Sequence, residues 1–169
     1  MDRPASTQTH PIGPTLASWQ KRSQSRFGRW LFARAVCRRS PYFASIKPHF
    51  LELRPALCVV AVVKQARVGD LPGTIHSLAI ANLCELAAGT VAEVTIPPTM
   101  QWVSRGMTIQ YLRRATSDVT ATARLDKSEW SDEQNVGVPV SVVDRNGTEV
   151  VRAVITLHVG PTVRTTSSP

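Results

Sequence analysis

Hydrophobic residues repeat at two different periods along the chain, and the change of period separates helical from extended segments. From Thr15 to Arg39 the apolar residues fall mostly three or four positions apart with basic residues between them, which predicts an amphipathic helix. Pro41 and Pro48 end this pattern, because proline cannot continue a helix interior. A second helix of about twenty residues is predicted over 73–94, before the run from Ile96 to Pro98.

The remaining apolar segments favour extended structure. Arg54-Pro55 divides one β-rich stretch into two strands, HFLELRPALCVVAVVKQ. Beyond residue 98 the period is two, and four more strands are predicted over MTIQYLRRA, VTATARL, VGVPVSVVD and VVRAVITLHV. Asn146-Gly147 predicts a tight hairpin turn between the last two. The order of elements predicts an α+β domain in which one antiparallel sheet carries a single long helix.

The length of 169 residues fits one domain over 15–160, with the N-terminal helix included and flexible tails at 1–14 and 161–169. Residues 73–94 are apolar on nearly every side. A helix of this kind must be covered on all faces, by a curved sheet or by a second subunit.

Composition places the chain among globular proteins, with 43% hydrophobic and 19% charged residues. No apolar run reaches the roughly 18 residues that span a bilayer, and no signal-peptide pattern begins the chain. We therefore expect a soluble, cytoplasmic protein without a transmembrane segment. Cys37, Cys58 and Cys84 lack metal-type spacing and are expected to be buried, reduced thiols. Neither a metal nor a cofactor is expected.

The net charge of +8 comes entirely from the N-terminal segment. Residues 1–47 contain nine basic side chains and one acidic side chain, whereas the other 122 residues contain eleven of each sign. Nucleic-acid binding usually spreads lysine and arginine over a folded surface with aromatic residues or a known motif. The sequence has no such motif, so a nucleic-acid partner is not expected.

Glu85 lies in the middle of the apolar helix, where an ionised and unpartnered carboxylate would cost several kcal/mol. Its neighbours three, four and seven positions away are mostly small, which leaves room for a substrate or another chain: Leu78, Ala81, Ala88, Gly89 and Ala92. Two interpretations stay open. Glu85 is either a functional acid, or a structural residue that bonds Asn82 or the backbone or reaches solvent.

His76 lies at the start of the same helix, where unpaired backbone N–H groups attract a developing oxyanion. It is nine positions from Glu85, or about 13.5 Å along the axis. One helix cannot bring both residues to one substrate group, whereas two antiparallel copies can, so a shared site requires a symmetric dimer. The alternative is that His76 is a cap or a packing residue.

The segments GTIHSLAIANLCELAAGT and SRGMTIQYLRRA resemble those of hotdog-fold acyl-CoA thioesterases, in particular the phenylacetate-pathway type and a related uncharacterised hotdog family. The resemblance covers about residues 16–160. It implies a sheet wrapped around the long helix, homodimers paired sheet edge to sheet edge, and often homotetramers. It also implies that Glu85 is the catalytic acid, that His76 and the N–H of Ser77 polarise the thioester carbonyl from the partner chain, and that Ser104 helps to place water.

Three positions depart from this family pattern. Asp70 stands where asparagine is typical, and an ionised aspartate cannot donate a hydrogen bond to a carbonyl. Ser77-Leu78 replaces Gly-Gly, and Glu85 replaces the more common aspartate. The expected activity is hydrolysis of a fatty or aromatic acyl-CoA. A non-catalytic module that binds acyl-CoA or acyl chains is the alternative that Asp70 favours, and a hydratase or dehydratase is a further one.

Coenzyme A carries several phosphate charges, so basic residues are expected near the mouth of the site. Arg113 and Arg114, at the end of a predicted strand, are the first candidates, followed by Arg105 and Lys64. For the basic N-terminal helix three roles are open: a cover over the acyl channel, a cover for the open face of the sheet, or a membrane-surface contact.

Overall fold

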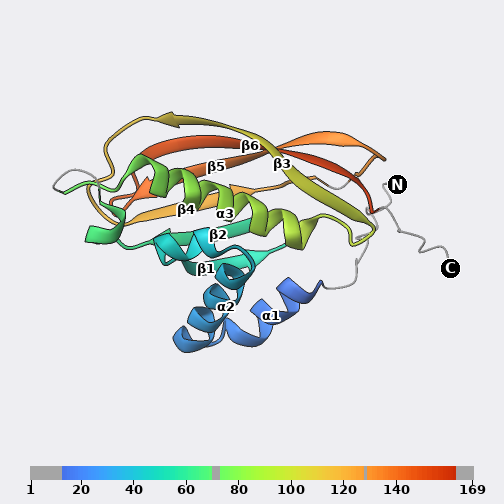
Figure 1. The fold of residues 1–169 in the computed structure, drawn as a ribbon, viewed down its shortest axis with the longest axis horizontal. Helices are drawn as coiled ribbons and strands as arrows, with labels where there is room; N and C mark the ends of the chain where they lie inside the picture. Colours follow the sequence, from blue (N-terminus) through green and yellow to red (C-terminus); the bar gives the residue numbers. More distant parts are fainter. Residues whose placement is uncertain (1–12, 70–72, 128, 163–169) are drawn as a thin grey trace, which may run out of the picture.

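The computed structural model describes residues 13–69, 73–127 and 129–162. Six strands form one antiparallel sheet in the order β1-β2-β4-β5-β6-β3 (Figure 1). Their bounds are β1 His49–Arg54, β2 Leu57–Val62, β4 Val119–Arg124, β5 Gln134–Asp144, β6 Glu149–Pro161 and β3 Met100–Tyr111. The long helix α3, Ser77–Thr95, lies along this sheet, so the predicted α+β class and the sheet wrapped around one helix are confirmed.

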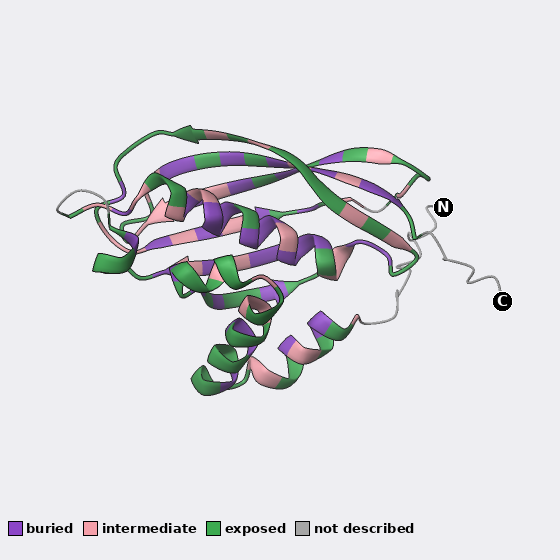
Figure 2. Ribbon diagram, in the orientation of Figure 1, coloured by how far each residue is buried: buried purple, intermediate pink, exposed green. Residues whose placement is uncertain are grey.

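Helix α3 is the centre of the hydrophobic core. Its sheet-facing side chains are buried, among them Leu83, Ala87 and Val91 at 0% exposure (Figure 2). By length and hydropathy alone, this helix could cross a bilayer. Its burial within the sheet accounts for that hydropathy, because 56% of the apolar window is covered by the protein itself.

The N-terminal segment forms two helices where the periodicity predicts one. Helix α1 spans Pro14–Arg22 and α2 spans Arg26–Arg39. The side chain of Ser25 caps α2 by accepting from the Gly28 N–H at 3.0 Å. A Cβ at position 28 would lie 2.1 Å from the carbonyl oxygen of Arg22, so glycine permits the close approach of the two helices. Apolar spacing continues across the break, because both helices bury side chains in the same core.

The two helices pack below the sheet through an aromatic cluster. Phe32 of α2 makes edge-to-face contacts with Trp19 of α1 and Phe50 of β1, with ring centroids 5.1 and 5.0 Å apart. The 3₁₀ helix η1, Pro41–Ile46, then leads into β1, and a short 3₁₀ helix η2, Ala66–Val68, follows β2. Pro14 begins α1 and Pro161 ends β6, whereas the rest of the predicted tails, 1–12 and 163–169, lies outside the described residues.

Both predicted strand connections are confirmed. Pro55 and Ala56 turn the chain between β1 and β2, with Ala56 in the left-handed region at φ 69°. The turn between β5 and β6 uses the Asp144 carboxylate, which accepts from the N–H groups of Asn146 and Thr148, and Gly147 at φ 80°.

Strand β3 differs from its prediction at both ends. It begins at Met100 rather than Met107, because a β-bulge between Ser104 and Gly106 interrupts the alternation from which the strand is recognised. It ends at Tyr111, so Arg113 and Arg114 follow the strand rather than belonging to it. Strand β3 is also an edge of the sheet, paired with β6 alone among the described strands.

Candidate active site

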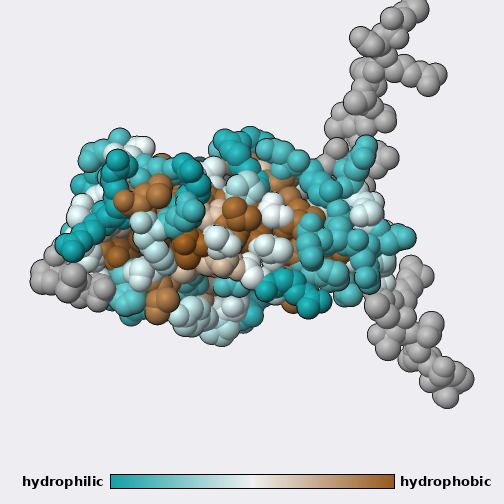
Figure 3. Space-filling model, turned by 90° about the horizontal axis from the view of Figure 1, so that it is seen from above, coloured by the Kyte–Doolittle hydropathy of each residue, from teal (hydrophilic) through white to brown (hydrophobic). Residues whose placement is uncertain are grey.

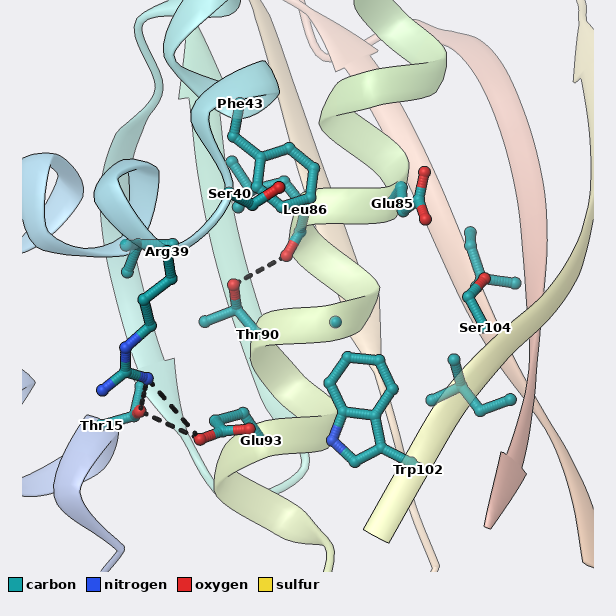
Figure 4. Close-up of a pocket in the computed structure, with 14 residues that line it drawn as sticks. Thr15, Arg39, Ser40, Phe43, Glu85, Leu86, Thr90, Glu93, Trp102 and Ser104 are labelled. Carbon is teal, nitrogen blue, oxygen red and sulfur yellow. Dashed lines mark hydrogen bonds and ion pairs between the residues drawn. The ribbon is translucent and has the colours of Figure 1, made fainter.

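A cavity of about 170 Å³ crosses the exposed face of α3 (Figure 4). Residues of α2 and η1 bound it on one side and residues of β3 and β6 on the other. Its walls are mainly apolar, formed by Val36, Phe43, Leu86, Trp102, Ile155 and Leu157. Because Gly89 contributes no side chain, the surface of α3 stays open between these walls, and a Cβ there would lie 3.2 Å from the Trp102 ring.

Glu85 lines this cavity one turn before Gly89 on the same face of α3. The sequence predicts a carboxylate buried among small residues, but Glu85 is exposed in the protomer. Ala88 and Ala92 are fully buried and face the sheet, whereas the Glu85 stripe of the helix is left uncovered. Within the described ranges no hydrogen bond or ion pair engages the Glu85 carboxylate, and Asn82 bonds elsewhere: its amide donates to the Tyr42 carbonyl and the Ser45 hydroxyl.

Ser104 lines the same cavity from β3, so the structure brings Ser104 and Glu85 together (Figure 4). The bulge explains the orientation of Ser104. Before the bulge, Ser104 is in phase with Trp102, which is partly buried against the core, and after it Met107 and Ile109 face inward. The bulge therefore allows one strand to present Ser104 to the cavity and still pack its second half on α3.

A polar cluster closes the far end of the cavity. The Arg39 guanidinium donates to the Thr15 hydroxyl at 3.1 Å and lies 3.8 Å from the Glu93 carboxylate, which also accepts from Thr15. These contacts join α1, α2 and α3. Neither this cluster nor the Trp102 and Phe43 walls are recognised from the sequence, because they depend on how the N-terminal helices cross α3. The two-residue spacing of Trp102 and Ser104 is the one signal that would have placed them on a common face.

His76 lies away from this cavity. It is the N-cap of α3, and its Nδ1 accepts from the Leu78 N–H at 3.0 Å, so the neutral ring carries its proton on Nε2. The ring lines a second pocket with Arg67, Tyr42 and Asn82. One protomer therefore does not bring His76 and Glu85 to one point, as their spacing along the helix predicts.

Ser77 lines a third pocket with Arg113 and Arg114. The Tyr111 hydroxyl donates to the Ser77 carbonyl at 3.1 Å. Burial, with a smaller contribution from Cys84, raises the pKa of Tyr111, so its hydroxyl is a neutral donor at neutral pH. The Ser77 N–H is the first amide of α3 and has no acceptor within the helix, whereas the amides of Ala79 and Ile80 donate to the His76 carbonyl.

The other candidate residues have different surroundings. The Lys64 ammonium donates to the carbonyls of Gly73 and Thr116, which fixes the segment before α3. Arg105 is exposed at the β-bulge, next to Ser104. Asp70 lies outside the described residues.

The thiols are poorly suited to nucleophilic chemistry. Cys58 and Cys84 are buried, and burial raises the pKa of Cys84 to about 12 and that of Cys58 further still. Cys37 is only partly buried, which corrects the expectation for that residue, and burial raises its pKa as well. The reactive thiolate form is therefore scarce near neutral pH.

Comparison with known proteins gives one family match and several structural relatives. The family described as Domain of unknown function (DUF4442) matches residues 28–159. A crystal structure known as genomics APC5556 is 36% identical, with a TM-score of 0.77, over 88% of this chain and 98% of that chain. No protein of curated function matches significantly.

Two thioesterase structures share the fold at low identity. A probable thioesterase of Pseudomonas aeruginosa, PA5026, is 14% identical with a TM-score of 0.69, over 77% of this chain and 93% of its own. Thioesterase HI1161 of Haemophilus influenzae is 14% identical with a TM-score of 0.68, over 81% of this chain and 94% of its own. These likenesses confirm the hotdog fold.

Proposed function

The chain belongs to the DUF4442 family and has the hotdog fold, and on that premise we propose that it is a thioester hydrolase acting on an acyl-CoA. The observation that carries the proposal is the joint position of Glu85 and Ser104 at the edge of an apolar cavity. A carboxylate without a partner can take a proton from water, and the apolar walls can hold an acyl chain or ring beside it.

A thioester needs little assistance to react with water. In the proposed reaction Glu85 takes a proton from a water molecule as the oxygen attacks the carbonyl carbon, and the C–S bond then breaks to release a thiolate. We propose that Ser104, which lines the same cavity, holds that water. A direct attack by Glu85, with an anhydride intermediate that water hydrolyses, uses the same residue.

The carbonyl also needs hydrogen-bond donors where negative charge develops. The Ser77 N–H, the first amide of α3, is of this kind, whereas the His76 N–H already donates to the Val68 carbonyl at 2.7 Å. Ser77 does not line the Glu85 cavity of its own protomer. We therefore propose that a second copy supplies the Ser77 N–H. Arg105, Arg113 and Arg114 are proposed to lie near the coenzyme A phosphates, whereas the bonds of Lys64 to two carbonyls favour a structural role for it.

Strand β3 supports a contact between two copies. It is twelve residues long, and its outer edge has no partner strand among the described residues. Figure 3, which looks onto this side of the molecule, shows apolar side chains along the middle of the face and hydrophilic ones around it. Val103 and Tyr111 of β3, and Leu112 directly after it, are between 45% and 52% exposed. A long edge with exposed apolar residues is typical of a surface that pairs with another chain.

The test is release of free thiol from short, medium, long and aromatic acyl-CoAs. Glu85→Gln removes the base and keeps the shape, so we expect turnover to fall by at least about 100-fold with the fold and oligomer unchanged. Glu129→Gln is the matched control, since it makes the same change at an exposed position outside the cavity. Retained activity in Glu85→Gln removes Glu85 from the mechanism.

The alternative function has its own outcome in the same assay. If the purified protein turns over no member of the panel yet binds acyl-CoA saturably, it is a non-catalytic acyl-CoA-binding module. The exposed position of Glu85 in the protomer is the observation that keeps this alternative open.

The shared site is tested with Ser77→Pro, which removes the N–H at the first position of α3, where proline is tolerated. His76, the residue before it, already has an extended backbone, φ −61° and ψ 137°, that proline accepts. Ser77→Pro and Glu85→Gln should each be inactive alone. After random subunit exchange, half of the dimers carry one intact site, so about a quarter of the activity should return. Confirmed exchange without recovery contradicts the shared site.

A further inference from the structure

We propose that the outward face of α2 docks onto the surface of an anionic lipid bilayer. This inference does not depend on the proposed hydrolysis. It rests on the apolar residues, the charges and the position of this helix.

Helix α2 has two apolar sides, and the core uses only one of them. Phe32 and Ala33 are buried against β1 and α1. Phe27, Trp30 and Leu31 fall three and four positions apart on the opposite side, with exposed fractions of 67%, 48% and 36%. The rings of Phe27 and Trp30 stack with centroids 5.6 Å apart, so they present one continuous aromatic surface to solvent.

Cationic side chains continue this aromatic face. Arg34 and Arg38 lie seven and eleven positions after Phe27, on the same side of the helix, and the Arg34 guanidinium lies 5.5 Å from the Trp30 ring centre. We call this set of five residues, Phe27, Trp30, Leu31, Arg34 and Arg38, the α2 outer face.

The surrounding segment is positively charged throughout. Residues 13–47 contain eight basic side chains and no aspartate or glutamate: Lys21, Arg22, Arg26, Arg29, Arg34, Arg38, Arg39 and Lys47. Within the described part of the chain, Arg39 alone among these eight forms an ion pair, with Glu93. The face therefore carries uncompensated positive charge, which an anionic surface would complement.

The shape and chemistry of the face favour a bilayer over other anionic partners. Tryptophan beside arginine on an amphipathic helix is typical of segments that lie in the membrane interface, where the rings enter the headgroup region and the charges meet anionic lipids. Helices α1 and α2 project from the sheet (Figure 1).

The experiment measures co-sedimentation of the full chain with two kinds of vesicle. One kind is phosphatidylcholine alone, and the other is phosphatidylcholine mixed with phosphatidylglycerol. We expect binding to the mixed vesicles, weakened by salt that screens the charges. Arg34→Gln with Arg38→Gln should weaken binding about thirty-fold, since each arginine near an anionic surface contributes about five-fold.

Phe27→Ser with Trp30→Ser should also weaken binding and should remove the blue shift of tryptophan emission that vesicles produce. Val63→Ser with Arg124→Gln is the matched control, because it removes one exposed apolar residue and one exposed cation elsewhere on the surface. Circular dichroism confirms that each variant is folded.

Three outcomes overturn the proposal. They are absence of binding to mixed vesicles at low salt, equal binding to both kinds of vesicle, and equal loss of binding in the control variant. Concentration-dependent self-association that disappears in Phe27→Ser with Trp30→Ser would instead assign the α2 outer face to a contact between copies of the chain, and this result also overturns the proposal.

Discussion

At position 89 the lack of a side chain determines the size of the candidate site. A Cβ there would press on the Trp102 ring, and any larger group would enter the space between the cavity walls. We expect Gly89→Leu to lower kcat/KM most for the bulkiest acyl groups and least for the shortest ones. The measurement is kcat/KM across an acyl-CoA series. A uniform loss for all chain lengths would show that the acyl group lies elsewhere.

Sequence reasoning identified Glu85 and the small residues around it but predicted the wrong burial. The apolar composition of α3 indicates that most of the helix is covered. It does not reveal one exposed stripe, because a few exposed residues hardly alter the composition of the whole helix. Which stripe stays open depends on where η1 and β3 lie beside the helix, and periodicity within α3 carries no information about its neighbours. The role of His76 as a cap was one of two open alternatives, and the Nδ1 contact shows that the cap is formed.

At the scale of elements, Gly28 determines how α1 and α2 meet. In Gly28→Ala the new methyl group would overlap the Arg22 carbonyl, so the helices must separate. We expect a loss of about 1–3 kcal/mol in the free energy of unfolding, measured by urea denaturation. Ala35→Ser, at an exposed position of the same helix, should change it by no more than about 0.5 kcal/mol. Equal effects of the two substitutions would contradict a tight contact at position 28.

The periodic pattern from Thr15 to Arg39 could not reveal this break. Ser23 to Ser25 interrupts the helix without changing the apolar spacing, and a capping serine is also compatible with a continuous helix. Most strands can be predicted from the sequence, because alternation and turn residues are local signals. The first half of β3 cannot, because the bulge interrupts the alternation.

A second element-scale prediction concerns the contact of Asp118 with the chain after β2. The Asp118 carboxylate accepts from the Lys64 N–H at 2.9 Å and from Arg145 at 3.1 Å, and these bonds lower its pKa. A lowered folded pKa stabilises the protein above the unfolded value of about 3.9, and this stabilisation is lost as pH falls through the folded pKa.

Asp118→Asn should therefore lower Tm at neutral pH and have a smaller effect at acidic pH. The side chain is 36% exposed, so the loss should not exceed about 1 kcal/mol. Thermal unfolding of both proteins from pH 7 to pH 3 measures it. Asp126→Asn, at an exposed position, is the control. A difference that grows toward acidic pH would contradict the assignment.

At the scale of the whole molecule, the edge of β3 that has no partner among the described strands is proposed to join two copies. Thr108 and Gln110 are exposed on this strand, and lysines there would face like charges across a twofold axis. We expect Thr108→Lys with Gln110→Lys to shift the protein toward monomers and to lower turnover in parallel. Analytical ultracentrifugation and the thiol assay measure the two effects.

Leu51→Lys is the control for this experiment, because it adds a lysine at an exposed position of β1, the opposite edge of the sheet. A monomer with full activity would contradict the shared site. An unchanged oligomer in the β3 variant would place the contact elsewhere.

The α+β class followed from local patterns, but the order of the strands did not. Placing β3 beside β6, at the far edge from β1, requires knowledge of long-range pairing that strand alternation does not contain. The wrapped sheet was instead implied by the resemblance of the α3 and β3 segments to hotdog proteins, and the structural relatives confirm it.

A contact between two copies through the outer edge of β3 would make the activity depend on protein concentration. If each site is completed only by a second chain, the active fraction follows mass action, so specific activity falls when the protein is diluted below the dissociation constant of the dimer. Rates measured at nanomolar enzyme would then understate those in a concentrated solution, and ligands that bridge both chains would restore them.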